Sequence, residues 1–139
     1  NMNGTFVDAS SFNQPLNDWD LSNCTIIDNM LAGASSFNQP LNNWDVSNVT
    51  SMIGVFFGAT NFNQPLDNWD TSNLPQYSTV SPSTLNMTDM FRNDNNINSF
   101  DQDISMWCVQ NIPTKPNGFD NGTLSTWTSS EKPNWGATC

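Results

Sequence analysis

The chain has 139 residues, of which 36% are hydrophobic, 12% aromatic and only 12% charged, and its net charge is −10. This length fits one domain, and the apolar content is enough for a core, whereas a disordered chain would have more charge and fewer aromatic residues. With three basic residues in all, the composition argues against a nucleic-acid partner, because phosphate contacts need Lys and Arg. An acidic surface instead favours cations or a basic partner. No apolar run is long enough to insert in a membrane, and no signal-peptide pattern is present.

One phrase occurs three times at a 25-residue spacing, as F-N-Q-P-L-N-D-W-D from Phe12, F-N-Q-P-L-N-N-W-D from Phe37 and F-N-Q-P-L-D-N-W-D from Phe62. A fixed period of this length is typical of stacked repeat proteins. Since Asn1 falls inside a repeat, we expect the chain to be the C-terminal part of a longer protein, with an open N-terminal layer that docks on further repeats or on a partner.

A fourth copy is displaced by 38 residues, which is thirteen more than the period. Thr88, Met90, Phe100 and Trp107 match, in order, Thr50, Met52, Phe62 and Trp69. About thirteen residues are therefore inserted after Asn73, within a Ser-, Thr- and Pro-rich segment at 74–85. We assign residues 1–107 to the repeats, including this insert, and residues 108–139 to a C-terminal cap.

Within one repeat, Thr50 to Gly58 has the spacing of a short helical turn, with Val49, Met52 and Phe56 on one face. A short parallel strand is expected either near Trp44-Asp45-Val46 or near the Gln-Pro-Leu of the phrase, and the sequence leaves the choice open. The predicted fold is therefore an α/β solenoid of about four repeats, with short parallel strands and short helical turns.

The aromatic residues of the phrase should stack from repeat to repeat as two core ladders. The alternative is a cofactor-binding or carbohydrate-stacking platform. The ladders comprise Phe12, Phe37, Phe62 and Phe100, and Trp19, Trp44, Trp69 and Trp107.

Aspartates form a column at Asp20, Asp45 and Asp70, where like charges repel unless they are compensated. Each Asp is expected to cap its own Ser-Asn turn. The alternative is bridging calcium, because calcium prefers hard oxygen ligands; no other cofactor is implied.

Asparagines form a second column, at Asn13, Asn38 and Asn63, which Asp101 continues. We expect these side chains to bond the backbone of the neighbouring repeat. The alternative is an ice-binding or glycan-binding face. The glycosylation motifs at Asn23, Asn48 and Asn86 share one repeat position under the 38-residue displacement, so they follow from the repeat and are weak evidence for glycans.

The insert is the candidate binding loop, because an irregular excursion from a rigid scaffold is a common place for binding residues. The candidate residues are Gln76, Tyr77, Ser78 and Thr79. Tolerated sequence drift is the alternative explanation.

After Trp107 the repeat pattern stops, and Cys108 replaces the aspartate of the earlier copies. We expect a disulfide between Cys108 and Cys139 that staples the cap, and this implies an oxidising, extracellular setting. Trp127 and Trp135 should cover the last repeat. Cys24 occupies the position of Val49, which predicts a buried apolar residue.

The phrase F-N-Q-P-L-N-N-W-D-V-S-N-V-T-S-M, followed by F-F-G-A-T-N-F, resembles the BspA-like leucine-rich repeat surface proteins over residues 1–107, the insert excepted. The resemblance implies a leucine-rich-repeat-like right-handed coil on an extracellular, cell or virion surface, used for adhesion or binding, with no enzymatic role. Its partners would be surface proteins or glycans. The insert and Asp103, which stands where other copies have Pro, depart from the pattern.

Catalytic chemistry has little support, because the absence of histidine removes Ser-His-Asp and Cys-His arrangements. The leading hypothesis is a non-enzymatic extracellular adhesion or binding module. The second is a structural or decoration component of a virion or surface assembly, such as a capsid, tail or fibre protein. A third, a glycoside hydrolase, would use paired carboxylates, either Asp101 with Asp103 or Asp18 with Asp20.

Overall fold

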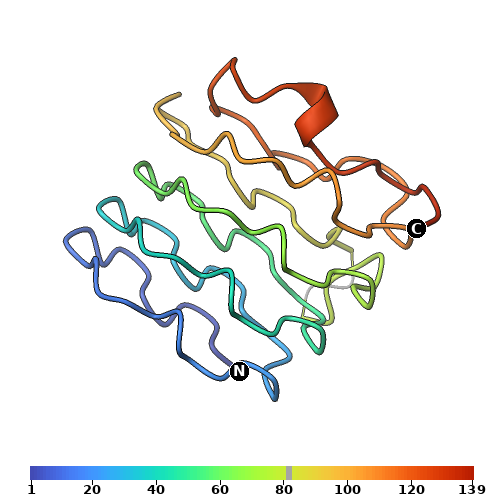
Figure 1. Cartoon of the computed structure of the whole chain (residues 1–139), viewed down its shortest axis with the longest axis horizontal. Coiled ribbons are helices and arrows are strands. Elements are labelled where there is room, and N and C mark those ends of the chain that lie inside the picture. The colour runs from blue at the N-terminus through green and yellow to red at the C-terminus, as the bar shows by residue number, and fades with distance from the viewer. Residues whose placement is uncertain (81–82) are drawn as a thin grey trace.

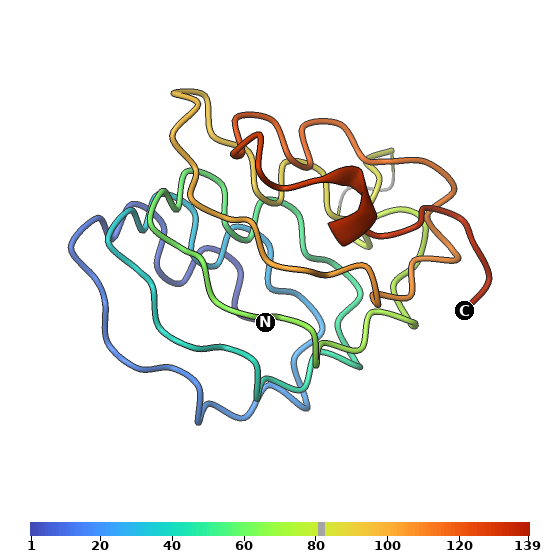
Figure 2. The ribbon, with the colours of Figure 1, turned by 45° about the horizontal axis from the view of Figure 1, so that its top comes forward.

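The repeats lie on one another as the layers of a single stack. The computed structural model describes residues 1–80 and 83–139, and successive layers run side by side from the N-terminus toward the C-terminus (Figure 1). A second view shows each layer as an open, irregular loop of chain (Figure 2). The C-terminal segment lies beside the fourth layer, whose Asp89, Phe91 and Asn93 N–H groups donate to the carbonyls of residues 117, 119 and 121, and it carries η1, Ser129–Glu131, a 3-10 helix.

The predicted α/β solenoid is wrong. Across residues 1–80 and 83–139, η1 is the sole helix, and there is no sheet. Pairing of the β type is limited there to two isolated bridges, Ile26 with Ser51 in parallel and Tyr77 with Leu85 antiparallel. The right-handed leucine-rich-repeat coil of short strands and helical turns therefore does not describe this chain.

The expected helical turn is absent because neighbouring residues send their N–H groups in alternate directions. In the second repeat, the N–H groups of Asn29 and Leu31 donate to Ile53 and Val55 of the next layer, whereas the intervening Met30 N–H donates to the carbonyl three residues before it. Asn29 has a φ of 54°, in the left-handed region that a right-handed helix cannot contain. The result is a run of tight turns bonded to the next layer.

The expected strand is absent because asparagine side chains take the place of a backbone ladder. Asn13 Oδ1 accepts the Asn38 N–H at 2.9 Å, Asn38 Oδ1 accepts the Asn63 N–H at 2.9 Å, and Asn63 Oδ1 accepts the Asp101 N–H at 3.2 Å. The proline two residues later in the phrase has no N–H and could not join a ladder. The predicted asparagine column, bonding from layer to layer, is thus confirmed.

The phenylalanine ladder forms as predicted. Phe12 and Phe37 are stacked with ring centroids 5.8 Å apart, and the next two pairs, Phe37 with Phe62 and Phe62 with Phe100, are each 6.0 Å apart. The side chains from Phe37 onward are almost completely buried. The rings of Phe37, Phe62 and Phe100 therefore belong to the core, and Phe12 packs against it.

The tryptophan ladder forms over three of its four members. Trp44 stacks on Trp69 at 6.1 Å, and Trp69 stacks on Trp107 at 5.9 Å. These three are 2–3% exposed, whereas Trp19, in the first layer, is 39% exposed.

The fourth layer matches the third only if the thirteen extra residues are divided between two places in the chain. The Phe56 N–H donates to the Met90 carbonyl and its ring stacks on Phe91, 35 residues on, which is ten more than the period. Phe100 stacks on Phe62 at a distance of 38 residues, so three more residues are inserted between Phe91 and Phe100. The match of Thr88 and Met90 with the start of the third repeat is therefore wrong for this half of the layer.

The C-terminal segment closes the stack. Cys108 and Cys139 form the predicted disulfide, with their Cα atoms 5.7 Å apart. Trp127 is 3% exposed and meets the Phe100 ring edge-on at 5.0 Å, so it covers the last layer. Trp135 is partly buried against the edge of Phe119. The free cysteine, Cys24, is buried.

Candidate functional site

The insert is closed at its base by hydrogen bonds between its two arms. Tyr77 pairs with Leu85 in an antiparallel bridge, and the Ser78 N–H donates to the Thr84 carbonyl at 3.0 Å. The Asn86 N–H donates to the Gln76 carbonyl at 3.1 Å. The described part of the insert is thus a short two-armed projection with a defined base, while Ser81 and Pro82 lie outside the described residues.

Asn86 fastens this base to the third layer. Its side chain is fully buried, its Nδ2 donates to the carbonyls of Thr50 and Pro75 at 3.0 and 3.1 Å, and its Oδ1 accepts the Met52 N–H at 3.1 Å. Asn86 therefore does not share the repeat position of Asn48, which is exposed. The acceptor asparagine of the Asn86 glycosylation motif is therefore buried.

A second buried contact joins the insert to the second and third layers. Asp28 Oδ1 accepts the Ser51 hydroxyl at 2.6 Å and the Ile53 N–H at 2.8 Å, and the Ser51 hydroxyl is also hydrogen-bonded to that of Ser78. Ser78 is 1% exposed, so this candidate loop residue faces the stack and supports the loop. Thr79, which is exposed, bonds the hydroxyl of Thr50 at 3.2 Å.

Two large apolar side chains of the described part of the insert are exposed. Tyr77 is 44% exposed and Val80 is 50% exposed, while Gln76 is half-buried. Large apolar side chains exposed on a fixed base are typical of an interaction surface. The candidate contact residues are therefore Tyr77, Thr79 and Val80, of which the sequence had suggested only the first two.

The aspartate column acts as turn caps. Asp20, Asp45 and Asp70 each accept the backbone N–H of the serine two residues on, at 2.9, 3.0 and 3.0 Å. Hydrogen bonds from that serine lower the pKa of all three carboxyls, although at Asp45 the charges of its two neighbours act in the opposite direction. Within the part of the chain that the structure describes, no group of three or more His, Cys, Asp or Glu side chains is placed to hold a metal ion.

Three of the four carboxylates considered for hydrolysis, Asp20, Asp101 and Asp103, accept hydrogen bonds within the stack. Asp101 Oδ1 accepts the Asn63 amide at 2.9 Å, and Asp103 Oδ1 accepts the Ser105 N–H at 2.9 Å. Hydrogen bonds from Ser105 lower the pKa of Asp103, as those from Ser22 lower the pKa of Asp20. A general acid needs a raised pKa, so neither Asp103 nor Asp20 is suited to that role.

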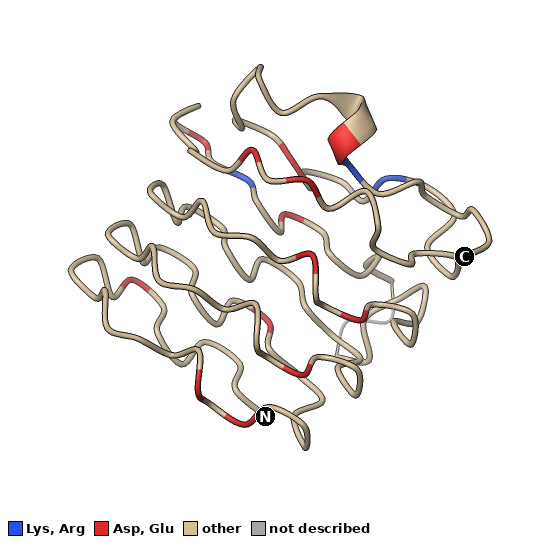
Figure 3. Cartoon of the chain, viewed as in Figure 1, with Lys and Arg blue, Asp and Glu red and all other residues tan. Residues whose placement is uncertain are grey.

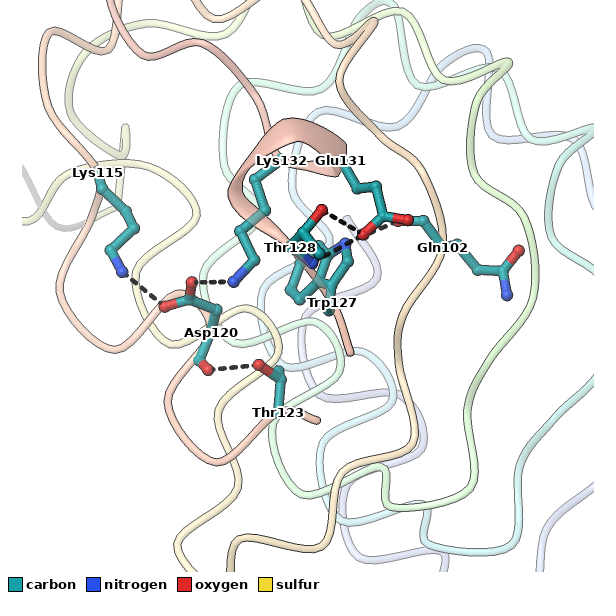
Figure 4. Close-up of polar contacts among 8 residues, drawn as sticks. All are labelled: Gln102, Lys115, Asp120, Thr123, Trp127, Thr128, Glu131 and Lys132. Atoms are coloured by element: carbon teal, nitrogen blue, oxygen red, sulfur yellow. Dashed lines mark hydrogen bonds and ion pairs between the residues drawn. The ribbon is translucent and has the colours of Figure 1, made fainter. Parts of the chain in front are cut away.

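All basic residues of the chain are held in ion pairs. Arg92 contacts Asp89 and Asp94 at 3.2 and 2.6 Å, and Lys115 and Lys132 both contact Asp120, at 2.8 and 2.9 Å (Figure 4). The negative charges recur in every layer, whereas the basic residues are confined to the last layers (Figure 3). Residues 1–80 therefore carry acidic side chains and no basic one.

Asp120 is the centre of the cap. Its side chain is only 9% exposed, and burial raises its pKa, but the hydrogen bonds and charges of Lys115 and Lys132 outweigh burial and hold the pKa below its ordinary value. Lys132 also lies over the Trp127 ring, 4.6 Å from its centroid. The ion pairs thus tie the cap segment to the tryptophan that covers the last layer.

These features define a capped stack of repeats that carries a fixed projection and an acidic surface. A family model described as "Mycoplasma protein of unknown function, DUF285" matches residues 1–84 and 78–134. The chain belongs to this family, which is consistent with a BspA-like repeat family. No curated protein and no solved structure matches the chain. The described residues include no helix long and apolar enough to cross a membrane.

Sequence reasoning missed the buried polar residues beneath the insert. Asp28, Ser51 and Asn86 are each buried, yet all three are polar residues directly beside core positions such as Ile27, Met52 and Met87. A polar residue that interrupts a buried segment usually has a specific partner. That pattern could have identified Asp28 and Ser51, whereas Asn86 was hidden by the misplaced register of the fourth copy.

Proposed function

We propose that this protein is a non-enzymatic binding module of an extracellular or cell surface, in which the repeat stack presents the insert to a surface protein or glycan. The observation that carries the proposal is the contrast within the insert. Its base is fixed by buried bonds from Asn86 and Ser78, while Tyr77 and Val80 are left exposed at its outer side.

Physical reasons favour binding through such a loop. A loop that is already ordered loses little conformational entropy on binding, so its exposed apolar side chains contribute more net affinity. Tyrosine combines a large apolar ring with a hydroxyl group and is enriched at interfaces. The acidic stack around the loop would favour a partner with neutral or basic groups and would repel acidic surfaces.

The test compares binding of the labelled chain to a printed glycan array and to fixed cells, the latter by flow cytometry. The variant Tyr77→Ala/Val80→Ser should lose at least tenfold in apparent affinity. The matched control, Ile97→Ser, alters a side chain that is 58% exposed outside the insert and should bind as the parent does. If the double variant bound as well as the parent, or if the parent bound nothing, the proposal would fail.

A structural component of a larger surface assembly, including a virion, is the second candidate. It is compatible with a stack of repeats, whose layers build up an extended surface. Electron microscopy of the chain in its native source would distinguish symmetric copies on a particle from isolated binding modules.

A further inference from the structure

The dipeptide Asn-Gly occurs three times in the chain, at Asn3, Asn117 and Asn121, and it is followed by Thr at both Asn3 and Asn121. Asparagine loses its side-chain amide most readily before glycine, because glycine has no side chain to hinder attack of its backbone nitrogen on the asparagine Cγ. The reaction needs a free N–H on the glycine and a free amide on the asparagine. The structure places these groups differently at the three sites.

The direction of the stack decides whether the glycine N–H is free. Alternate N–H groups of each layer point to the following layer, and in the first layer Gly4 donates in this way to the Asp28 carbonyl at 2.9 Å. Residues 117–122 form a last half-layer, whose carbonyls accept N–H groups of the fourth layer. In this half-layer the Gly122 N–H has no acceptor within the part of the chain that the structure describes. The nitrogen that must attack is therefore bonded at one Asn-Gly-Thr and free at the other.

The carbonyl of the same peptide bond also differs between the two sites. The Asn121 carbonyl accepts the Asn93 N–H at 2.7 Å, while the Asn3 carbonyl accepts no bond from a described residue. When a base removes the Gly122 proton, negative charge spreads onto the Asn121 carbonyl oxygen, and a hydrogen bond to that oxygen stabilises the charge. The Asn121 side chain is exposed and bonds no described residue, so it can turn toward the nitrogen. These differences all favour reaction at Asn121.

We propose that Asn121 is a deamidation site, at which a base takes the Gly122 N–H proton and the Gly122 nitrogen attacks the Asn121 Cγ. The new N–Cγ bond closes a succinimide ring, the Cγ–Nδ2 bond breaks, and Nδ2 leaves as ammonia after taking a proton from water. Water then opens the ring, giving aspartate by attack at Cγ and isoaspartate by attack at the backbone carbonyl. The net reaction consumes water and releases ammonia, with no oxidant or reductant.

Asn117 should react more slowly because a carboxylate lies beside it. The Gly118 N–H also has no acceptor among the described residues, but a Cβ built on Gly118 would collide with Asp89 Oδ1. The negative charge of that carboxylate, which its ion pair offsets only in part, opposes removal of a proton there. The atoms that a Cβ on Gly122 would meet belong instead to asparagine backbones. Reaction at Asn121 should therefore be faster than at Asn117.

The product changes the place where the cap joins the stack. Isoaspartate lengthens the backbone and moves the carbonyl that accepts the Asn93 N–H. Glycine is required at position 122, because its φ is 79° and a Cβ there would collide with the Asn93 carbonyl. The half-layer at 117–122 thus contains a labile dipeptide that its own geometry demands. Conversion of Asn121 should loosen the cap and leave the earlier layers in place.

The experiment incubates the full chain at pH 8 and follows each Asn-Gly by peptide mapping, with fragmentation in the mass spectrometer to separate aspartate from isoaspartate. In the folded chain, Asn121 should deamidate at least tenfold faster than Asn3, with Asn117 between them. The same incubation in guanidinium chloride and dithiothreitol is the matched control. The stack is then unfolded, and the two Asn-Gly-Thr sites should react at nearly the same rate.

The variant Asn121→Gln tests the consequence for the cap. Glutamine closes the corresponding larger ring far more slowly, and the exposed Asn121 side chain has no bond with a described residue to lose. Hydrogen exchange at the Asn93 amide should rise with incubation time in the parent and stay constant in this variant. An exchange rate that stayed constant in the parent while Asn121 was converted would overturn the predicted loosening.

Three results would overturn the assignment of the site. The first is a rate at Asn3 equal to or above that at Asn121 in the folded chain. The second is a difference that persists in guanidinium chloride, because its cause would then be the local sequence. The third is faster reaction at Asn117 than at Asn121. The inference does not depend on the insert, so its failure would leave the binding result at Tyr77 and Val80 unchanged.

Discussion

The indole Nε1 of Trp107 donates a 2.8 Å hydrogen bond to the backbone carbonyl of Leu66, 41 residues earlier in the chain. The same bond joins Trp44 to Leu16 and Trp69 to Leu41, at a separation of 28 residues. The tryptophan of each phrase thus fills the core and also satisfies a buried carbonyl of the layer before. The greater separation at Trp107 reflects the insertion, which the stack accommodates without losing the bond.

Replacing Trp69 by Phe should lower the free energy of unfolding by about 2 to 4 kcal/mol, because the substitution removes apolar volume and leaves the buried Leu41 carbonyl without its donor. Urea unfolding followed by circular dichroism would measure this. Trp19→Phe is the matched control, since Trp19 is 39% exposed, and it should cost less than about 1 kcal/mol. Equal effects of the two substitutions would contradict the role given to the indole bond.

Asn38→Ala should cost about 1 to 3 kcal/mol, because Asn38 Oδ1 accepts both the Asn63 N–H and the Gln64 side-chain amide, at 2.9 and 3.0 Å. Asn43→Ala provides the control at a nearby exposed asparagine whose side chain takes part in no described bond. The measurement is again the urea midpoint at constant slope. An Asn38 variant as stable as the Asn43 variant would show that the asparagine column is not stabilising.

Removal of the disulfide by Cys108→Ser and Cys139→Ser should destabilise the chain by about 3.5 to 4 kcal/mol, as expected for closing a loop of 31 residues. Dithiothreitol should lower the unfolding midpoint of the parent to that of the double variant. The double variant itself should not respond to the reductant. A parent midpoint that does not move under reducing conditions would contradict this prediction.

Acid should weaken the cap through Asp120. Because its pKa is lowered in the folded protein, the stabilisation is fully present above the ordinary carboxyl pKa of about 3.9, and it is lost as the pH falls through the folded value. Asp120→Asn should therefore cost about 1 to 2 kcal/mol at pH 7 and progressively less below about pH 4.

Asp94→Asn is the control for this acid effect. Asp94 pairs with Arg92 but is 61% exposed, so its removal should cost at most about 1 kcal/mol at any pH. Stability curves of the parent and both variants between pH 2 and pH 8 provide the measurement. An Asp120 variant whose deficit persists unchanged at pH 2 would show that the loss comes from packing.

The sequence predicted the contacts that repeat along the period. The phenylalanine ladder, the Trp44–Trp69–Trp107 ladder, the asparagine column and the disulfide all follow from residues that recur or end at fixed places. These side chains contact one another in any stack of such layers, whatever local conformation the backbone adopts. For this reason the core could be predicted while the backbone could not.

The prediction of a helical turn was wrong for an identifiable reason. The apolar spacing of residues 50–58 fits a helix, yet Gly54 and Gly58 both adopt a positive φ, 59° and 67°, which a helix excludes. In a chain with this many Asn, Asp and Gly residues, tight turns compete with helix and strand at every layer. Hydrophobic spacing alone does not resolve that competition.

The candidate site was predicted only in part. The insert was located from its composition, but of the residues that hold it, Asn86 was assigned to a glycosylation motif of the repeats and Ser51 was given no role. The division of the insertion into ten and three residues has no counterpart in the phrase itself. This division is seen in the hydrogen bonds between the third and fourth layers. The sequence does not reveal them, because the first half of the fourth repeat differs too much from the earlier copies.

The divided insertion also has a consequence for folding. Layers of nearly identical sequence could pair out of order, one period early or late, and still form most of the same side-chain bonds. Asn86 and Ser78 find their partners at one place only, against Thr50 and Ser51 of the third layer. The irregular fourth layer therefore favours one order of stacking over the others. In this way each layer of a chain of near copies obtains a defined neighbour.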